Sequence, residues 1–204
     1  MIVPLSREHM SAVARLHCAS LRGLLRDLGE PAARAYYSGA LGLEHAVAFV
    51  FLEGGAVAGF VAGSIHPDRM KNGVLAANPA GVLAGILTGS VRRPSSLWWL
   101  ARSLRGPEAG AYDSRVPELT YLATDERHRR HGVGRQLVEA FSAALRARGV
   151  SACELSVDED NRSASGFYEQ LGFRQVGRYQ EFGTQHIRYR IELASLPASR
   201  TVDA

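Results

Sequence analysis

The C-terminal part of the chain has the most regular alternation of apolar and polar positions. Apolar residues recur at helical spacing from Gly132 to Arg148, which predicts a helix with one buried face. Strands and a shorter helix are predicted around it, at 118–124, 153–157, 173–182 and 185–193 for the strands and 161–171 for the helix. This order of strand, helix, strand and helix implies at least one parallel crossover connection.

The N-terminal third predicts a strand, two helices and a β-hairpin. Residues 2–4 can start a strand, and Ser6 caps an amphipathic helix that follows it. A second helix is expected at 31–41. Two apolar runs, at 45–52 and 56–65, flank a turn with two glycines, which is the pattern of a hairpin.

The segment 66–113 interrupts this periodic order. Glycine, proline and asparagine punctuate it, and two short helices are expected in it, at 80–87 and 94–104. A connection of this length in a compact domain is usually functional or disordered. The predicted organisation is therefore one domain, a helical insertion within it and a flexible tail, at 1–194, 66–113 and 195–204.

Composition and charge indicate a soluble globular protein. The chain has 204 residues, of which 46% are hydrophobic and 22% charged, and this suits one domain with a buried core. Its net charge of +4 comes almost wholly from arginine, because Lys71 is the only lysine. Arginine binds phosphates and carboxylates, so a phosphorylated cofactor or a nucleic acid would fit, and a merely solvated basic surface would fit as well.

Cysteine usage and apolar patterns favour a cytoplasmic location. Cys18 and Cys153 are far apart and form no CxxC pair, which is typical of a reducing compartment. The N-terminus has no signal-peptide pattern, and the most apolar later stretch, 82–91, is too short to span a bilayer. The seven histidines form no HExxH or other ligand set, so no metal is expected.

A glycine-containing segment at the start of the long helix is the first functional signal; it reads Arg129-Arg130-His131-Gly132-Val133-Gly134-Arg135. The first N–H groups of a helix have no partner within it and carry the positive end of its dipole, so they can bind an anion. Glycine lets a pyrophosphate approach this backbone, and Arg127 and the other arginines add positive charge. GxxxxGK[ST] is excluded because no Lys-Ser or Lys-Thr pair exists, and GxGxxG fails because Leu137 replaces its third glycine. A tight turn without a ligand is the alternative.

Two motifs in this region resemble those of the GNAT superfamily of N-acetyltransferases. The cofactor motif of that family is Arg or Gln, two residues, Gly, one residue, then Gly or Ala, and Arg129-x-x-Gly132-x-Gly134 matches it. The second motif, an Asn followed by a helix with Ala, Tyr and Leu-Gly-Phe, is matched by 161–173. The resemblance implies an α/β fold with a mixed, mostly antiparallel sheet of about seven strands, flanked by helices. The insertion would lie between the third and fourth strands.

The resemblance also implies acetyl-CoA as co-substrate and indicates the residues that would hold it. Main-chain amides from Arg130 to Arg135 would bind the pyrophosphate, and Leu122 and Thr124 would pair with the pantetheine arm on a strand that separates from its neighbour. Asn161 would hydrogen-bond the same arm, and it could instead or also cap the following helix. The full set implied for the cofactor is Leu122, Ala123, Thr124, Arg129, Arg130, His131, Gly132, Val133, Gly134, Arg135, Asn161, Ala164 and Tyr168.

Tyr168 and Glu118 are the catalytic residues that the resemblance implies. Tyr168 matches the family tyrosine that points at the thioester sulfur, where a phenol can protonate the leaving thiolate; a buried aromatic with a backbone-bonded hydroxyl is the alternative. An alkylamine must lose a proton before it attacks, which costs roughly 4 kcal/mol at pH 7. Glu118 matches the general base of one branch of the family, and an exposed strand-end carboxylate is the alternative. A second branch uses a position that is Ser156 here.

The implied function is transfer of an acetyl group from acetyl-CoA directly to a primary amine, in a small molecule, amino sugar or peptide, through a ternary complex. Cys153 lacks an evident partner base, so an acyl-cysteine step is not expected. The alternatives are a catalytically silent acyl-CoA sensor and a basic nucleic-acid-binding module at 92–105. The insertion, which contains Trp98 and Trp99, is expected to form a lid over the acceptor or a homodimer contact.

Overall fold

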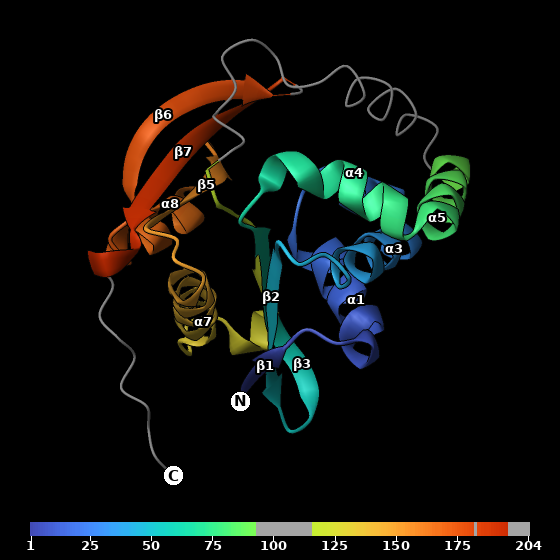
Figure 1. Ribbon diagram of the computed structural model, residues 1–204, viewed down its shortest axis with the longest axis horizontal. Coiled ribbons are helices and arrows are strands. Elements are labelled where there is room, and N and C mark those ends of the chain that lie inside the picture. The colour runs from blue at the N-terminus through green and yellow to red at the C-terminus, as the bar shows by residue number, and fades with distance from the viewer. Residues whose placement is uncertain (93–115, 182, 196–204) are drawn as a thin grey trace.

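The computed structural model describes residues 1–92, 116–181 and 183–195, and in them a seven-stranded sheet carries helices on both faces (Figure 1). The strand order is β1-β2-β3-β4-β5-β7-β6. The strands are β1 Ile2–Pro4, β2 Ala46–Glu53, β3 Ala56–Ser64, β4 Glu118–Thr124, β5 Ala152–Asp158, β6 Arg174–Glu181 and β7 Thr184–Glu192. Neighbours are antiparallel except β4 and β5, which are parallel. This mixed, mostly antiparallel sheet confirms the predicted fold class.

Helices α1 (Met10–Ser20) and α3 (Glu30–Ala40) cover one face of the N-terminal half of the sheet. Val13 of α1 and Tyr37 of α3 are fully buried against Val50 and Phe60 of the sheet. Burying these apolar side chains provides the main driving force for the helices to dock on the strands. The short helix α2 (Leu24–Leu28), which the apolar pattern did not predict, connects them.

Helices α7 (Val133–Ala147) and α8 (Arg162–Gln170) lie on the opposite face, with α7 on the other side of the central strands from α1 in Figure 1. The apolar residues of α7 recur three or four positions apart, so they form one stripe that is buried against β3, β4 and β5. The buried residues of that stripe are Val133, Leu137, Val138, Phe141 and Leu145. The position of the predicted helix, 132–148, is confirmed to within one residue at each end.

The described part of the insertion is helical and follows β3, as predicted. Helix α4 (Pro67–Ala77) and helix α5 (Pro79–Arg92) pack on α3, where Met70 and Val74 form a small core with Ala40. The helix expected at 80–87 is therefore the centre of a longer one, and α4 was not predicted. The helix expected at 94–104 lies outside the described residues, as do Trp98 and Trp99.

Most other predicted elements are present with small shifts of their ends. The hairpin of β2 and β3, helix α3 and the two C-terminal strands are all confirmed. Ser6 precedes a 3₁₀ turn, η1 (Arg7–His9), so the first α-helix begins later than predicted. Two further 3₁₀ turns are η2 (Glu126–His128) and η3 (Leu193–Ser195).

None of the described helices is by itself long and apolar enough to cross a bilayer. Helices α4 and α5 reach that length and composition only as a pair, and they meet at a bend of 93°.

Candidate active site

Strands β4 and β5 separate almost as soon as they meet. Over the described length of both strands their register contains one pair, Glu118 with Glu154, whereas β4 pairs with β3 along its whole length. The edge of β4 that faces β5 therefore has no partner strand from Leu119 to Thr124. Unpaired backbone N–H and C=O groups on such an edge can accept an extended ligand by β-type hydrogen bonds. Leu122, Ala123 and Thr124, which the sequence predicted for the pantetheine arm, all lie on this edge.

A β-bulge in β4 sets the direction of the side chains around the gap. Tyr121 and Leu119 pair with the consecutive residues Ala62 and Gly63, so Thr120 is the extra residue. Such a bulge breaks the alternation of side chains and increases the local twist. Gly63 is required here, since a Cβ at this position would lie 2.1 Å from the carbonyl oxygen of Glu118. The close approach of β3 thus fixes the start of β4, where Glu118 stands.

The glycine segment opens α7 with a row of unpaired donors. Gly132 has φ 79° and is the N-cap, and Arg130 has φ 64°, the left-handed region that costs a non-glycine residue energy. The N–H groups from Arg130 to Arg135 find no acceptor in the described part of the chain, and the first helical bond runs from Gln136 to Gly132. Consecutive N–H groups in this conformation form an anion-binding concavity at the positive end of the helix.

The charges around this loop differ from the sequence prediction at Arg127. Its guanidinium is bound to Asp125, with Nε 3.1 Å from Oδ1 and Nη2 3.3 Å from Oδ2, and this hydrogen bond lowers the pKa of Asp125 to about 2. Arg127 is therefore engaged by a carboxylate and is not free to add charge to the loop. Arg129 donates from Nε to the carbonyl oxygen of Thr124 at 3.4 Å. The remaining exposed side chains at the loop are Arg130, His131 and Arg135.

His128 is held away from the role of a phosphate ligand. Its Nε2 is in contact with a carboxylate oxygen of Glu53 on the β2–β3 hairpin, and its Nδ1 lies 3.5 Å from Asp125. The ring therefore ties η2 to the hairpin. Together with the pairing of Arg127, this places two side chains around the loop in contact with carboxylates.

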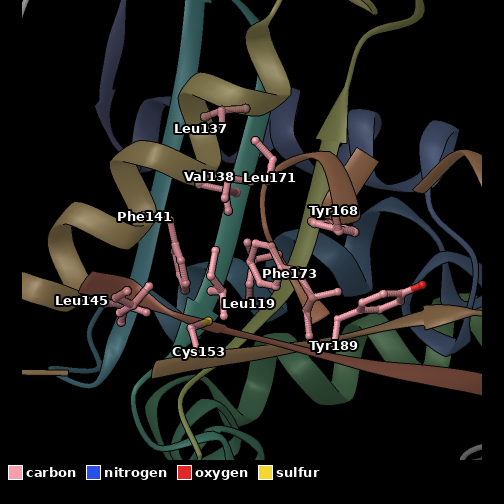
Figure 2. Packing of buried hydrophobic residues seen from close by; sticks show 14 of the residues in the cluster. Leu119, Leu137, Val138, Phe141, Leu145, Cys153, Tyr168, Leu171, Phe173 and Tyr189 are labelled. Atoms are coloured by element: carbon pink, nitrogen blue, oxygen red, sulfur yellow. The ribbon is translucent and has the colours of Figure 1, made fainter. Parts of the chain in front are cut away.

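Tyr168 is buried on α8 among the core residues that face α7 (Figure 2). Its ring packs edge-on against Phe167 and Phe173, with centroids 5.1 and 5.4 Å away. Among the described residues its hydroxyl has no hydrogen-bond partner, so the backbone-bonded alternative is not observed. Burial raises the pKa of the phenol, which keeps it protonated across the physiological range.

Asn161 caps α8, as the structural alternative predicted. Its Oδ1 accepts a hydrogen bond from the N–H of Ala164 at 3.2 Å. The amide group of the side chain is exposed and keeps its NH₂ donors available. Capping and a contact with a ligand are therefore compatible at this position.

Cys153 is a buried thiol on β5. Burial raises its pKa to about 12, so it stays protonated and is a poor nucleophile. No group of three or more His, Cys, Asp or Glu side chains in the described residues has a metal-binding arrangement, and the absence of a metal stays a prediction.

Glu118 is buried and paired, which rules out the interpretation as an exposed strand-end carboxylate. Its side chain is 10% exposed, and its Oε2 lies 3.4 Å from Nη2 of Arg188 on β7. Burial raises the pKa of Glu118, while the charge of and hydrogen bond from Arg188 oppose that shift. A buried carboxyl with a raised pKa and a specific charged partner is a candidate acid–base group.

The same arginine joins residues that sequence reasoning did not select. Arg188 donates from Nε to Oε2 of Glu154 at 2.8 Å and from Nη1 to Oγ of Ser156 at 2.9 Å. Ser156 also accepts a hydrogen bond from the hydroxyl of Tyr179 on β6 at 2.9 Å. We call these four residues, together with Glu118, the β4–β7 polar cluster. Charged residues alternating with apolar ones in β5 and β7 were the available sequence signal.

Glu118 and Tyr168 point to opposite faces of the sheet. Leu119, Cys153 and Leu155 belong to the core that contains Tyr168, and side chains alternate along a strand. Glu118 and Glu154, their neighbours in sequence, therefore project from the other face. The carboxylate and the phenol are therefore on opposite faces of the sheet where β4 and β5 separate.

Aromatic side chains from α1, α3 and β4 continue the face that carries Glu118. Tyr121 makes edge contacts with Tyr36 and His17, at centroid distances of 5.8 and 4.9 Å. His17 is fully buried, and its Nδ1 is 2.7 Å from the hydroxyl of Tyr37. Burial, with Glu118 and Glu181 nearby, raises the pKa of Tyr121 to about 12. These phenols therefore remain neutral beside the carboxylate.

Arg22 connects the helical layer with the loop that follows β5. Its Nη1 lies 2.8 Å from a carboxylate oxygen of Asp160 and 3.8 Å from one of Asp158. Arg22 and Asp160 are 138 positions apart in the chain. Asp160 precedes Asn161, so this ion pair ties the turn between α1 and α2 to the start of α8.

Comparison with known proteins finds a family and relatives among acetyltransferases. The family model described as the acetyltransferase (GNAT) family matches residues 12–173. Mycothiol acetyltransferase of Beutenbergia cavernae is 33% identical over 95 residues, which cover 44% of this chain and 32% of that protein. N-alpha-acetyltransferase 30 of Schizosaccharomyces pombe is 32% identical over 74 residues, which cover 35% of this chain and 49% of that protein. The chain thus matches half or less of the length of these relatives.

A solved structure extends the likeness to nearly the whole fold. The ribosomal-protein-S18-alanine N-acetyltransferase of Escherichia coli superimposes with a TM-score of 0.58 at 17% identity, covering 95% of this chain and 93% of that one. The fold, the separated strands and the family match agree, and the chain belongs to the acetyltransferase (GNAT) family.

Proposed function

We propose that the protein transfers an acetyl group from acetyl-CoA directly to a primary amine in a ternary complex. The observation that carries this proposal is the gap between β4 and β5, which has a row of unpaired N–H donors near one end and a carboxylate and a phenol on its two faces. An amine on the face of the sheet that carries Glu118 could reach a thioester bound in the gap. The Tyr168 hydroxyl could reach the leaving thiolate from the opposite face.

The cofactor would be held mainly by the backbone. The N–H groups from Arg130 to Arg135 would donate to the pyrophosphate, with the side chains of Arg129, Arg130 and Arg135 and the N-terminus of α7 adding positive potential. The free edge of β4 from Leu122 to Thr124 would pair with the two amides of the pantetheine arm. Asn161 would donate its NH₂ group to the same arm while its oxygen caps α8.

The chemical step uses the two side chains in different roles. Glu118, directly or through a water, takes the proton from the bound ammonium, and the amine nitrogen attacks the thioester carbon. The tetrahedral intermediate collapses with cleavage of the carbon–sulfur bond, and the Tyr168 hydroxyl gives its proton to the leaving thiolate. The attacking nitrogen loses its second proton to solvent as the amide forms, and solvent returns a proton to the Tyr168 phenolate. The amide product forms without a covalent enzyme intermediate, in agreement with the inert Cys153.

An amine acceptor is supported by the relatives and by the surface beside Glu118. One relative is named as an N-alpha-acetyltransferase. Tyr36 and Tyr121 line the approach to Glu118 with neutral phenols, whose rings and hydroxyls suit a bound ammonium. Helix α4 packs against α3 close to Tyr36, which supports a role for the insertion at the acceptor side of the site.

The decisive experiment is a thiol-release assay with acetyl-CoA against a panel of amines. The panel contains a peptide with a free N-terminus, lysine, a polyamine and an amino sugar. We expect release of CoA thiol that depends on one class of amine, with mass spectrometry showing the acetylated product. Binding of CoA in calorimetry together with no turnover on any amine would favour the acyl-CoA sensor instead.

A pair of tyrosine variants separates catalysis from stability. Tyr168→Phe should lower kcat by roughly 100-fold to 1,000-fold and leave the unfolding free energy nearly unchanged, since the hydroxyl has no partner in the described residues. Tyr189→Phe is the matched control, because the Tyr189 hydroxyl donates to Glu169 at 2.9 Å. It should cost about 1 kcal/mol of stability and leave kcat close to wild type.

A further inference from the structure

Arg188 occupies a central position in the β4–β7 polar cluster. Its guanidinium is in contact with two carboxylates from two different strands, Glu118 on β4 and Glu154 on β5, and with Ser156. The Arg188 residue is 3% exposed, and both carboxylate side chains are 10% exposed. Buried charges are stable only when paired and hydrogen-bonded, so these contacts constrain one another.

The register of the sheet explains why this arginine reaches both carboxylates. Arg188 pairs with Ser156 across β5 and β7, and Glu154 is two residues before Ser156 on the same face. Glu154 in turn pairs with Glu118 at the point where β4 and β5 separate. Adjacent strands lie about 4.8 Å apart, so the two glutamates are neighbours with like charge. The guanidinium of Arg188 lies against both of them.

We propose that Arg188 is the positioning residue of Glu118, whose carboxylate it holds at the entrance of the gap while Glu154 and Ser156 hold Arg188 in place. The inference rests on the proposed function, in which Glu118 receives the proton of the amine. Three donors of one planar guanidinium are used, so the arrangement depends on the fork of arginine as well as on its charge. Glu154 acts on Glu118 only through Arg188 and through like-charge repulsion.

Several other titratable groups belong to the same electrostatic environment as Glu118, with Cys153 acting from the opposite face of the sheet. Those that interact with it come from α3, β4, β5 and β6, and they are Tyr36, Tyr121, Cys153, Glu154, Tyr179 and Glu181. The positive charge in contact with the Glu118 carboxylate comes from Arg188 on β7. Removing it therefore leaves Glu118 surrounded by acidic or neutral groups.

The test follows the ionisation of Glu118 directly. Full-length protein labelled with ¹³C at the glutamate carboxyl carbons is titrated by NMR, and Glu118→Gln identifies the resonance. In Arg188→Met the apparent pKa of Glu118 should rise by roughly 1 to 3, because an adjacent arginine lowers a carboxyl pKa by this amount. In Glu154→Gln it should fall, since a like-charged neighbour is removed, and the double variant should lie between the two.

Arg190→Met is the matched control. Arg190 stands two residues from Arg188 on β7 and also contacts Glu154, at 3.5 Å, and its other ion pair is with Glu192. Its removal should move the titration of Glu118 much less than Arg188→Met does. An equal shift in both variants would mean that general charge, rather than the position of Arg188, controls Glu118, and the inference would be wrong.

Turnover supplies the second readout. The acidic limb of the kcat/KM profile, which reports ionisation of the free enzyme, should move with the NMR value in each variant, because the base must be unprotonated to act. Arg188→Lys keeps the positive charge and loses the planar set of guanidinium donors. The acidic limb of its pH profile should therefore stay near that of the wild type, while kcat falls roughly 10-fold to 100-fold.

The outcomes separate this inference from the proposed function. If the titration of Glu118 is unchanged in Arg188→Met, the inference is wrong, whether or not the protein acetylates an amine. If Arg188→Met does not fold, the same conclusion follows from an unchanged titration in Glu154→Gln. Wild-type kcat in Arg188→Lys overturns the positioning role as well. Absence of amine acetylation by the wild type refutes the proposed function, and the NMR titration then still decides whether Arg188 sets the state of Glu118.

Discussion

The two sides of the gap between β4 and β5 are built in different ways. On the side proposed for the cofactor, the polar groups are backbone N–H donors of one continuous segment, Arg130 to Arg135, shaped by two residues in the left-handed region. On the side proposed for the acceptor, the polar groups are buried ionisable side chains contributed by several strands and helices, with Glu118, Arg188 and His17 among them. The first side depends on local conformation, and the second on burial and pairing.

This difference predicts how each side responds to perturbation. Backbone donors do not titrate near neutral pH, so the affinity for a diphosphate should change little from pH 6 to pH 8 apart from the ionisation of the ligand. Buried ionisable groups have shifted pKa values, so catalysis and stability should depend on pH through the acceptor side. The predictions below test that contrast.

The largest expected effect comes from Glu118→Gln. Without the base only the small neutral fraction of the amine can react, so kcat at pH 7 should fall by roughly 100-fold to 10,000-fold, with partial recovery at alkaline pH. Glutamine can still accept from Arg188, so the fold should be retained. The measurement is a pH profile of kcat/KM with the amine identified by the panel; a profile like that of the wild type would remove Glu118 from the mechanism.

His17→Gln should change the pH dependence of stability. Burial lowers the pKa of His17 from 6.5 to about 4, so the folded state holds the neutral ring and the unfolded state takes up the proton first. Stability from this residue is complete above pH 6.5 and is lost as the pH falls toward 4, a loss of about 3 kcal/mol. Urea unfolding of the wild type and the variant at pH 7 and at pH 5 measures this loss. The unfolding free energy should decrease less from pH 7 to pH 5 in the variant, and equal decreases would mean that His17 is not the group responsible.

Two glycine substitutions distinguish a ligand site from a strained turn on the cofactor side. Gly132 and Gly149, at the two ends of α7, have φ 79° and 75°, so alanine at either should cost about 1 to 2 kcal/mol of stability. Only Gly132→Ala places a methyl group beside the free N–H donors, and it should weaken CoA binding roughly 10-fold. Calorimetry with CoA checks this; equal affinities in the two variants would favour the alternative of a turn without a ligand.

The smallest expected effect is that of Arg22→Met. The ion pair with Asp160 is largely exposed, so its loss should change the unfolding free energy by less than about 1 kcal/mol. It ties the turn after α1 to the start of α8, however, and loosening it should raise KM for the amine more than KM for acetyl-CoA. Steady-state kinetics with each substrate varied in turn measure the two values. A change confined to acetyl-CoA would place this contact on the cofactor side.

Sequence reasoning succeeded where the relevant groups are neighbours in the chain. The order of strands and helices in the C-terminal part, the helix that follows the glycine segment and the cap at Asn161 were all predicted, because periodicity and capping are local properties. It failed to find α4 and α2, which pack mainly on other helices and leave a weak apolar pattern. It also counted Arg127 as a free charge, since its pairing with Asp125 depends on the shape of the turn.

The amino-acid sequence alone predicted the class of fold and the segment proposed to bind a diphosphate, because helix starts, apolar spacing and the two family motifs each involve residues close together in the chain. Only the tertiary structure decided the environment of Glu118. Its partners Glu154 and Arg188 stand 36 and 70 positions further along the chain and meet it through the register of three strands. Pairing across a sheet joins residues that no local pattern relates, so the burial and charge of the acceptor side follow from the sheet as a whole.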